Sequence, residues 1–343
     1  MTLLKMSVDD SQNQKVVVAM SGGVDSSVAA ALLKRAGFNV TGVFMKLSNT
    51  PGDALSRAKS VAQTIGIPFR VLDLRKEFQK RVIGIFLKEY KEGRTPNPCV
   101  ICNKEVKFGL LMKKARTLGA DFLATGHYIS LKNGRLFKAK DESRDQSYFL
   151  WRINQKQLQH VLFPIGDFTK TETRALARKF KLPVAETPAS QEICFISGDI
   201  NDFLKDYFHP QKGKIFDVSG KVLGEHQGLI FYTIGQRKGI MLPQGPYWVK
   251  DKDFKNNILI VTKNEKDLLK KELRFKNVNW LSGKIPKMPL KIKAKIRSRS
   301  ALASTVVYQN NRVVFTRSQR AITPGQSVVF YRGQELIGGG IIC

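Results

Sequence analysis

Residues 16–37 constrain the fold more than any other segment, because a β-branched apolar run, a glycine pair and an alanine-rich stretch follow one another without a gap. This order predicts a strand, a tight loop and a helix. Gly22 and Gly23 let the backbone turn with no side chain in the way of a ligand, and the N–H groups at the start of the helix attract an anion. Ser21 and Ser26 add hydroxyl donors. The segment therefore predicts a cradle for a pyrophosphate group.

Asp25 lies inside this loop, where its carboxylate is placed to hold Mg²⁺ or to fix the loop. The segment is not a Walker A loop, because no Gly-Lys-Ser/Thr follows, and it lacks the spaced glycines of a dinucleotide fold. A simpler alternative is a strand-to-helix turn with a serine cap. The strand before the loop and the helix after it favour phosphate binding.

The charge balance predicts a polyanionic partner. The 343 residues include 58 Lys and Arg against 28 Asp and Glu, a net charge of +30. A hydrophobic content of 42% places this excess on folded domains, so nucleic acid is the expected partner, although a host rich in lysine would explain part of it. Four cysteines, no apolar run of bilayer length and no signal peptide predict a reducing, cytoplasmic setting without membrane association.

Strands and helices alternate through the first part of the chain. Strands are expected at 39–45, 69–74 and 121–126, and helices at 53–65, 77–90 and 103–118. This alternation predicts an α/β fold with a doubly wound parallel sheet. Ligands of such sheets bind at the carboxyl ends of the strands, so we expect residues 21–27, Met45, Gly126 and His127 to converge on one edge.

From about residue 205 short alternating runs replace the helical periodicity. They predict a small mixed central domain and a C-terminal antiparallel β-barrel. The expected division is a flexible leader at 1–14, a catalytic domain at 15–204, the central domain at 205–268 and the barrel at 269–343.

One barrel strand carries an unmixed set of cations. Because strand side chains alternate, its apolar residues fall on one face and its cations on the other: Lys291, Lys293, Lys295, Arg297 and Arg299. A solvated face would usually mix signs, since adjacent like charges repel. We expect a phosphate-binding track, with an ordinary solvated face as the alternative.

The cysteines suggest a reactive thiol. Asn103 is expected to cap a helix that begins near Lys104, which would place Cys102 at a helix N-terminus close to Lys107. Such a setting lowers the pKa of a thiol and favours the thiolate. The four histidines are scattered singly, so a zinc site is not expected. Cys194 lies between apolar residues, so a buried, inert thiol is an alternative to a reactive one at this position.

Several stretches resemble a known family. Ser-Gly-Gly-Val-Asp-Ser at residues 21–26 resembles the signature of the PP-loop ATP pyrophosphatases, which have the adenine nucleotide alpha hydrolase-like fold. Further stretches are similar to the tRNA-specific 2-thiouridylases, in order along nearly the whole chain: 95–108, 124–128, 145–150, 192–195, 224–229, 234–239, 323–327 and 338–341.

The resemblance implies ATP-dependent 2-thiolation of the wobble uridine in tRNAs for lysine, glutamate and glutamine. ATP would adenylate the 2-carbonyl oxygen and release pyrophosphate. Cys194 would carry a persulfide received from a sulfur-donor protein (a cysteine desulfurase or a relay protein), and Cys102 would be the nucleophile, leaving a transient Cys102–Cys194 disulfide. The products would be 2-thiouridine, AMP and pyrophosphate. We expect the enzyme to act as a monomer.

The resemblance also implies three sets of contact residues. ATP, with Mg²⁺, is assigned to Ala19, Met20, Ser21, Gly22, Gly23, Val24, Asp25, Ser26, Met45 and Gly126. The target base is assigned to Asn97, Pro98 and Cys99. Other parts of the tRNA are assigned to His127, Arg144, Asp145, Gln146, Arg297, Ser298 and Gln326. From the residues alone, His127 is as well explained as a hydrogen-bonded, half-buried histidine, and Gln146 and Gln326 as turn stabilisers.

Cys99 departs from the family pattern, because many members carry Asp at this position, with an acid–base or positioning role. A thiol is less acidic, so that role is lost, moved or taken by a Cys99 thiolate. A labile iron–sulfur cluster on Cys99, Cys102 and Cys194 is an alternative. Two other functions also stay open: a small-molecule adenylating enzyme, such as a nucleotide amidotransferase, and a non-catalytic RNA-binding protein.

Overall fold

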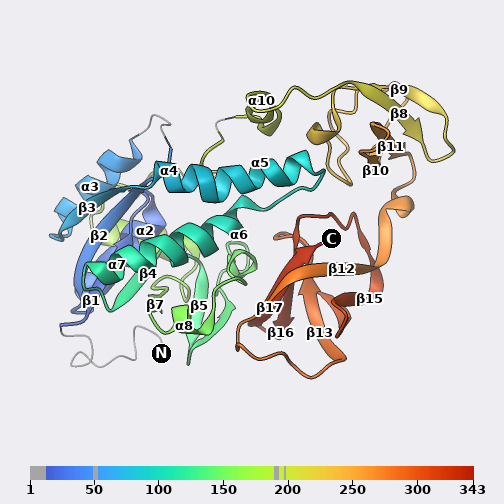
Figure 1. The fold of residues 1–343 in the computed structure, drawn as a ribbon. Helices are drawn as coiled ribbons and strands as arrows, with labels where there is room; N and C mark the ends of the chain where they lie inside the picture. Colours follow the sequence, from blue (N-terminus) through green and yellow to red (C-terminus); the bar gives the residue numbers. More distant parts are fainter. Residues whose placement is uncertain (1–12, 49–52, 189–192, 197) are drawn as a thin grey trace.

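The computed structural model describes residues 13–48, 53–188, 193–196 and 198–343. A parallel sheet with strand order β3-β2-β1-β4-β7 forms the first part of the molecule (Figure 1). The predicted doubly wound parallel sheet is therefore confirmed. Its strands are β1 (Lys15–Ala19), β2 (Asn39–Lys46), β3 (Phe69–Asp73), β4 (Phe122–Thr125) and β7 (Val161–Leu162).

Helices pack on both faces of this sheet, because alternate residues of a strand point in opposite directions. Val16 lies in one buried cluster with residues of α2 (Val24–Arg35) and α3 (Ala54–Thr64), whereas Val17 lies in another with residues of the segment 98–117. Among the described residues, no helix has the length and apolarity needed to cross a membrane. The other helices here are α4 (Arg75–Phe78), η2 (Gln79–Ile83), α5 (Gly84–Lys91), α6 (Pro98–Cys102), η3 (Asn103–Leu111), α7 (Met112–Thr117), η4 (Ser147–Phe149), α8 (Gln155–Leu158), α9 (Lys170–Lys179) and α10 (Ile200–Lys205).

Two further sheets follow, as predicted from the short alternating runs. The first is small and mixed, with strand order β10-β11-β8-β9. The second closes into an antiparallel barrel, because β12 pairs with both β15 and β17. The strands are β8 (Gly213–Asp217), β9 (Val222–His226), β10 (Trp248–Asp253), β11 (Ile258–Thr262), β12 (Leu269–Trp280), β13 (Leu290–Lys295), β14 (Ala303–Tyr308), β15 (Arg312–Arg320), β16 (Ser327–Arg332) and β17 (Glu335–Ile342).

The barrel is joined to the first domain by a shared sheet and by buried hydrogen bonds. The hairpin β5 (Ile129–Lys132) and β6 (Arg135–Lys138) extends the barrel sheet, with β6 pairing to β17. The buried side chains of Tyr148 and Trp151 both bond Ser327: the Tyr148 hydroxyl donates to its carbonyl at 2.9 Å, and Trp151 Nε1 donates to its Oγ at 3.0 Å. The first domain and the barrel therefore share one buried interface.

Candidate nucleotide and thiol site

The glycine loop lies between β1 and α2. Gly22 has φ of +75°, and a Cβ there would lie 2.2 Å from the carbonyl oxygen of Ala54, so this position requires glycine. Among the described residues, a Cβ on Gly23 would meet only Ser21 Oγ, at 3.6 Å, so this side of the loop leaves room for a ligand. Ser26 Oγ accepts from the Ser21 N–H at 3.1 Å. The loop thus presents a surface with several hydrogen-bond donors, as an anion cradle requires.

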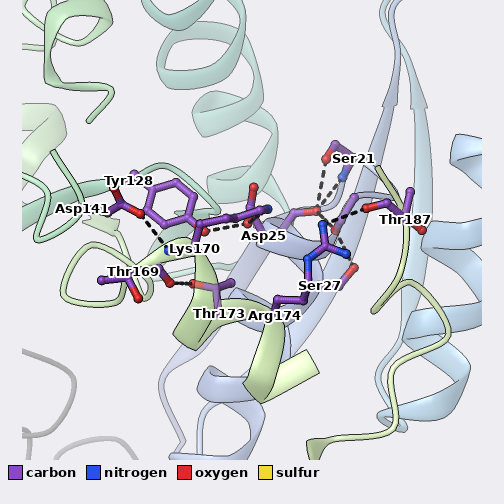
Figure 2. Close-up of polar contacts among 12 residues, drawn as sticks. Ser21, Asp25, Ser27, Tyr128, Asp141, Thr169, Lys170, Thr173, Arg174 and Thr187 are labelled. Atoms are coloured by element: carbon purple, nitrogen blue, oxygen red, sulfur yellow. Dashed lines mark hydrogen bonds and ion pairs between the residues drawn. The ribbon is translucent and has the colours of Figure 1, made fainter. Parts of the chain in front are cut away.

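Asp25 fixes this loop to two other elements. Its Oδ1 accepts from Lys170 Nζ at 2.6 Å and from the Tyr128 hydroxyl at 2.8 Å (Figure 2). Lys170 is the first residue of α9, which begins with a capping box formed by Thr169 and Glu172. Of the two expected roles for Asp25, the one in fixing the loop is therefore visible in the geometry.

The segment after β4 contacts the loop directly. A Cβ on Gly126 would lie 2.5 Å from the Ser26 nitrogen, so only glycine allows this approach. Tyr128, two residues later, reaches Asp25. The expected convergence of Gly126 and the loop on one edge of the sheet is confirmed.

His127, which lies between these two contacts, points the other way. Its Nδ1 lies 2.7 Å from Thr125 Oγ1, and its Nε2 lies 3.3 Å from Lys107 Nζ. The side chain is only 7% exposed. Burial, and then the charge of Lys107, hold the pKa of His127 well below its ordinary value, so the imidazole is neutral. The structure thus places His127 in the interior, with both ring nitrogens occupied.

The helix that carries Cys102 begins earlier than predicted. Asn97 is its N-cap, and the Asn97 side chain accepts from the N–H groups of Cys99 and Val100 at 3.1 and 3.4 Å. The expected cap, Asn103, is wrong: it has helical backbone angles, and its side chain donates to the Phe149 carbonyl at 3.1 Å. A proline in the first turn suits an earlier start, because its missing N–H has no partner to lose there. Cys102 therefore lies inside a helix.

The expected low pKa of Cys102 is also wrong for the free protein. The residue is buried, at 7% exposed, and burial raises the pKa of its thiol to about 12. The Lys107 charge lowers it only in part, and negative charge on Cys194 or Cys99 raises it further. The charge of Lys104 does not contribute to the pKa of Cys102.

The thiols of Cys99, Cys102 and Cys194 lie close enough together to influence one another. Negative charge on Cys99 or Cys194 raises the pKa of Cys102, and negative charge on Cys99 raises the pKa of Cys194. The segment that carries Cys194 packs against the helices of the first domain, with the ring centroid of Phe195 5.5 Å from that of Phe86. All of these thiols are free, and Cys99 and Cys194 are exposed. The structure therefore brings Cys194 close to Cys102, although the two residues are far apart in the sequence.

A metal site on these cysteines has no support in the described part of the chain. Within it, no group of three His, Cys, Asp or Glu side chains is arranged to hold a metal ion. The thiols are near one another, but they do not form the ligand set that an iron–sulfur cluster needs.

Several residues expected to contact tRNA are engaged within the protein. Asp145 Oδ1 accepts from the Ala139 N–H at 3.1 Å, and Gln146 Oε1 accepts from the Tyr128 N–H at 2.9 Å. Gln326 Nε2 donates to the Thr95 carbonyl at 2.8 Å, which ties the barrel to the segment before α6. Arg144 and Ser298 lie at positions that are exposed and half-buried, respectively.

The cationic strand is confirmed in part. Lys291 and Lys293 of β13 are exposed, while Ile292 between them is buried. The strand ends at Lys295, however, and Arg297 leaves the predicted face. Its Nη2 donates to the carbonyls of Ile234 and Ala321 and to Thr323 Oγ1, at 3.2, 2.9 and 2.9 Å. Arg297 thus connects the central domain to the barrel.

Sequence models of known domains match successive parts of the chain. They are described as the tRNA methyl transferase HUP domain (residues 14–198), the tRNA methyl transferase PRC-barrel domain (201–263) and the Aminomethyltransferase beta-barrel domain (270–342). The tRNA-specific 2-thiouridylase MnmA 2 of Thermoanaerobacter sp. (strain X514) is 46% identical over 359 residues, covering 96% of this chain and 98% of the relative. The chain belongs to the tRNA-specific 2-thiouridylase family.

Other 2-thiouridylases agree with this assignment. The MnmA of Syntrophomonas wolfei is 42% identical over 339 residues, covering 96% of this chain and 99% of the relative. That of Clostridioides difficile (strain 630) is 43% identical over 355 residues, with 96% and 98% covered. A solved 4-thiouridine synthetase–RNA complex with bound ATP has a TM-score of 0.39 and 21% identity, covering 53% of this chain and 45% of that chain. The relatives confirm the resemblance to 2-thiouridylases that the motifs indicated.

Sequence reasoning missed Lys170 and did not foresee the bond between Lys107 and His127. The capping box at Thr169 and Glu172 marks the start of α9 and was a usable signal for that helix. Nothing local indicated that its first residue would reach Asp25, because the pair is separated by 145 positions. The Lys107–His127 contact likewise joins a helix to a loop that follows a strand.

Proposed function

We propose that this chain uses ATP to replace the 2-oxygen of the wobble uridine in tRNA with sulfur. One observation carries the proposal. Gly126 and Tyr128 contact the glycine loop, and His127, which lies between them in the chain, contacts the Lys107 side chain beside the thiols. A phosphate cradle and a group of thiols therefore share one edge of the sheet. The first matching domain is named for methyl transfer, but two thiols that lie close together suit the sulfur chemistry for which the full-length relatives are named.

In the first step the glycine loop would bind the phosphates of ATP. The open face of Gly23 and the loop hydroxyls fit a phosphate, and Mg²⁺ would supply charge neutralisation there. Met45 and Gly126 would lie beside the nucleotide, with the remaining contacts at Ala19, Met20, Ser21, Gly22, Gly23, Val24, Asp25 and Ser26. The uridine 2-oxygen attacks the α-phosphate, so that the O–P bond forms as pyrophosphate leaves. The 2-oxygen then departs as part of AMP.

The second step would transfer sulfur between the thiols. A donor protein places a persulfide on Cys194, whose exposed position suits delivery from outside. The Cys102 thiolate attacks the inner sulfur of this persulfide, forms the Cys102–Cys194 disulfide and releases hydrosulfide. Hydrosulfide attacks C2 of the adenylated uridine and expels AMP. An external thiol reductant then reopens the disulfide.

The uridine would enter beside the start of α6. Asn97, Pro98 and Cys99 would contact the flipped base, since unpaired anticodon bases leave the stack at low cost. Arg144 and Ser298 would contact other parts of the tRNA, and His127, Asp145, Gln146, Arg297 and Gln326 would shape that surface from within. We assign the domains as in the sequence: 15–204 for catalysis, with 205–268 and 269–343 for tRNA binding. One chain supplies all of these groups, which suits a monomer.

Incubation of the enzyme with ATP, a persulfide source and unmodified tRNA tests the proposal. We expect 2-thiouridine in the nucleosides, measured by mass spectrometry, together with AMP and pyrophosphate. Cys194→Ser should abolish thiolation and leave tRNA-dependent ATP–pyrophosphate exchange intact, because adenylation precedes sulfur transfer. Cys343→Ser is the matched control and should retain both activities. Wild-type enzyme that forms no 2-thiouridine, or a Cys194→Ser enzyme that still forms it, would contradict the proposal.

A further inference from the structure

The ammonium group of Lys107 is held in place by a buried histidine. His127 Nε2 lies 3.3 Å from Lys107 Nζ, and His127 Nδ1 lies 2.7 Å from Thr125 Oγ1. Because the imidazole is neutral, one ring nitrogen donates and the other accepts. Lys107 has donors only, so Nε2 is the acceptor and Nδ1–H donates to Thr125. His127 and Thr125 are both buried, which fixes the direction of the lysine side chain.

The local helix geometry explains how Lys107 reaches the thiols. η3 is a π-helical stretch that begins directly after Cys102. Hydrogen bonds from i to i+5 widen the turn, so a residue five positions on lies near the same face, which it would not do in an α-helix. Gly109 shows the same widening, because a Cβ there would lie 2.7 Å from the Lys104 carbonyl oxygen. Lys107 follows Cys102 by five positions and so turns toward it.

The charge of Lys107 lowers the pKa of all three thiols. Among the described residues it is the one charged side chain that favours the anion at Cys99, Cys102 and Cys194 alike. Glu105 lies on the same helix but faces other cations, with Arg81 at 3.6 Å and Lys104 at 3.4 Å. No carboxylate in the described part of the chain opposes the charge of Lys107 at these sulfurs.

We propose that Lys107, held by the neutral imidazole of His127, is the cation that stabilises the sulfur anions formed at Cys102 and Cys194 during transfer. This inference rests on the proposed function. In the free protein, burial keeps the Cys102 proton in place. When the proton passes to water, the thiolate that remains faces the ammonium of Lys107. His127 acts through Lys107 and is a positioning residue, which gives a buried histidine at this site a role without contact to tRNA.

The test measures the reactivity of Cys102 without ATP or tRNA. In full-length protein with Cys99→Ser, Cys194→Ser and Cys343→Ser, the rate of alkylation by iodoacetamide is followed across neutral and alkaline pH. Lys107→Gln should move the pH dependence up by about one unit, which is about tenfold slower alkylation at a fixed pH below the midpoint. Lys107→Arg should stay close to the parent profile. Lys113→Gln, an exposed lysine on the following helix, is the matched control and should leave it unchanged.

A second variant addresses the histidine. His127→Phe keeps the ring but removes the acceptor, so the profile should move in the same direction by less than in Lys107→Gln. Unchanged alkylation in Lys107→Gln overturns the inference, whatever the enzyme does with tRNA. In the enzyme with all its cysteines, Lys107→Gln should slow thiolation while ATP–pyrophosphate exchange continues. Loss of exchange and thiolation together would show that the lysine serves adenylation instead, and would also overturn it. Failure of the wild-type enzyme to thiolate tRNA contradicts the proposed function and leaves the alkylation result standing.

Discussion

Lys170 Nζ lies 2.6 Å from Asp25 Oδ1, which links the glycine loop to the first residue of α9. The pair is partly shielded, with side chains 15% and 33% exposed. The Tyr128 hydroxyl donates to the same oxygen. The position of the loop carboxylate is therefore set by tertiary contacts, and α9 takes part in shaping the proposed nucleotide site.

Replacement of this lysine should affect both folding and adenylation. In Lys170→Met, Asp25 keeps only the Tyr128 donor to Oδ1, and we expect the free energy of unfolding to fall by about 1 kcal/mol. ATP–pyrophosphate exchange should fall more than this stability loss explains, because the loop is no longer held. Urea denaturation and exchange assays measure the two effects. Lys179→Met, on the same helix and exposed, is the control, and equal exchange in the two variants would contradict the prediction.

Two glycines near the loop should respond differently to alanine. In Gly126→Ala the new methyl would lie 2.5 Å from the Ser26 backbone, so we expect a loss of about 1–3 kcal/mol in stability. In Gly23→Ala the methyl meets no atom of the described residues closer than 3.6 Å, and φ is −99°, so folding should be unaffected. The same methyl would face the phosphates and weaken ATP binding. Thermal unfolding and ATP titration separate the cases; a destabilised Gly23→Ala protein would refute this account of the loop.

The buried histidine should make stability depend on acid pH. The pKa of His127 in the folded protein is held below its unfolded value of 6.5, mainly by burial. At acid pH the unfolded chain therefore binds a proton that the folded protein does not bind. The stabilisation is present above about pH 6.5 and is lost as the pH falls below that value. His127→Asn should show a shallower loss of unfolding free energy between about pH 7 and pH 5 than wild type. Parallel curves for the two proteins would count against a neutral, buried imidazole.

The exposed lysines of β13 should contribute to tRNA affinity. Lys291→Ala combined with Lys293→Ala removes two cations, so the slope of log K against log salt should shrink by about two. Lys59→Ala, on α3 and away from the barrel, is a single-charge control that should leave the slope unchanged. Binding is measured by filter retention over a range of salt concentrations. An unaltered slope in the double variant would mean that this face of the strand does not bind tRNA.

The parallel sheet could be predicted from the sequence because its strands are continuous apolar runs separated by amphipathic helices. The barrel strands were also visible, since Ile292 and its neighbours alternate with lysines. The barrel was predicted, but the strand pair that closes it, β12 with β17, was not, because this pairing depends on residues far apart in the chain. The same limit applies to the β5–β6 hairpin, which belongs to the barrel sheet although it lies in the first domain.

The site shows where local rules fail. Asn103 and Asn97 are both acceptable helix caps by residue type, and the sequence prediction chose Asn103, whereas the helix begins after Asn97 with a proline in its first turn. A basic neighbourhood was expected to lower the pKa of Cys102, yet burial outweighs it. Burial depends on packing by the segment around Phe195, which lies far along the chain.

The shared sheet between β6 and β17 limits how the enzyme can move. The barrel cannot swing away from the nucleotide loop without breaking that strand pairing and exposing Tyr148 and Trp151. The domain that carries the exposed lysines and the domain that carries the glycine loop are therefore tied together by this pairing and by the buried bonds of Tyr148 and Trp151 to Ser327.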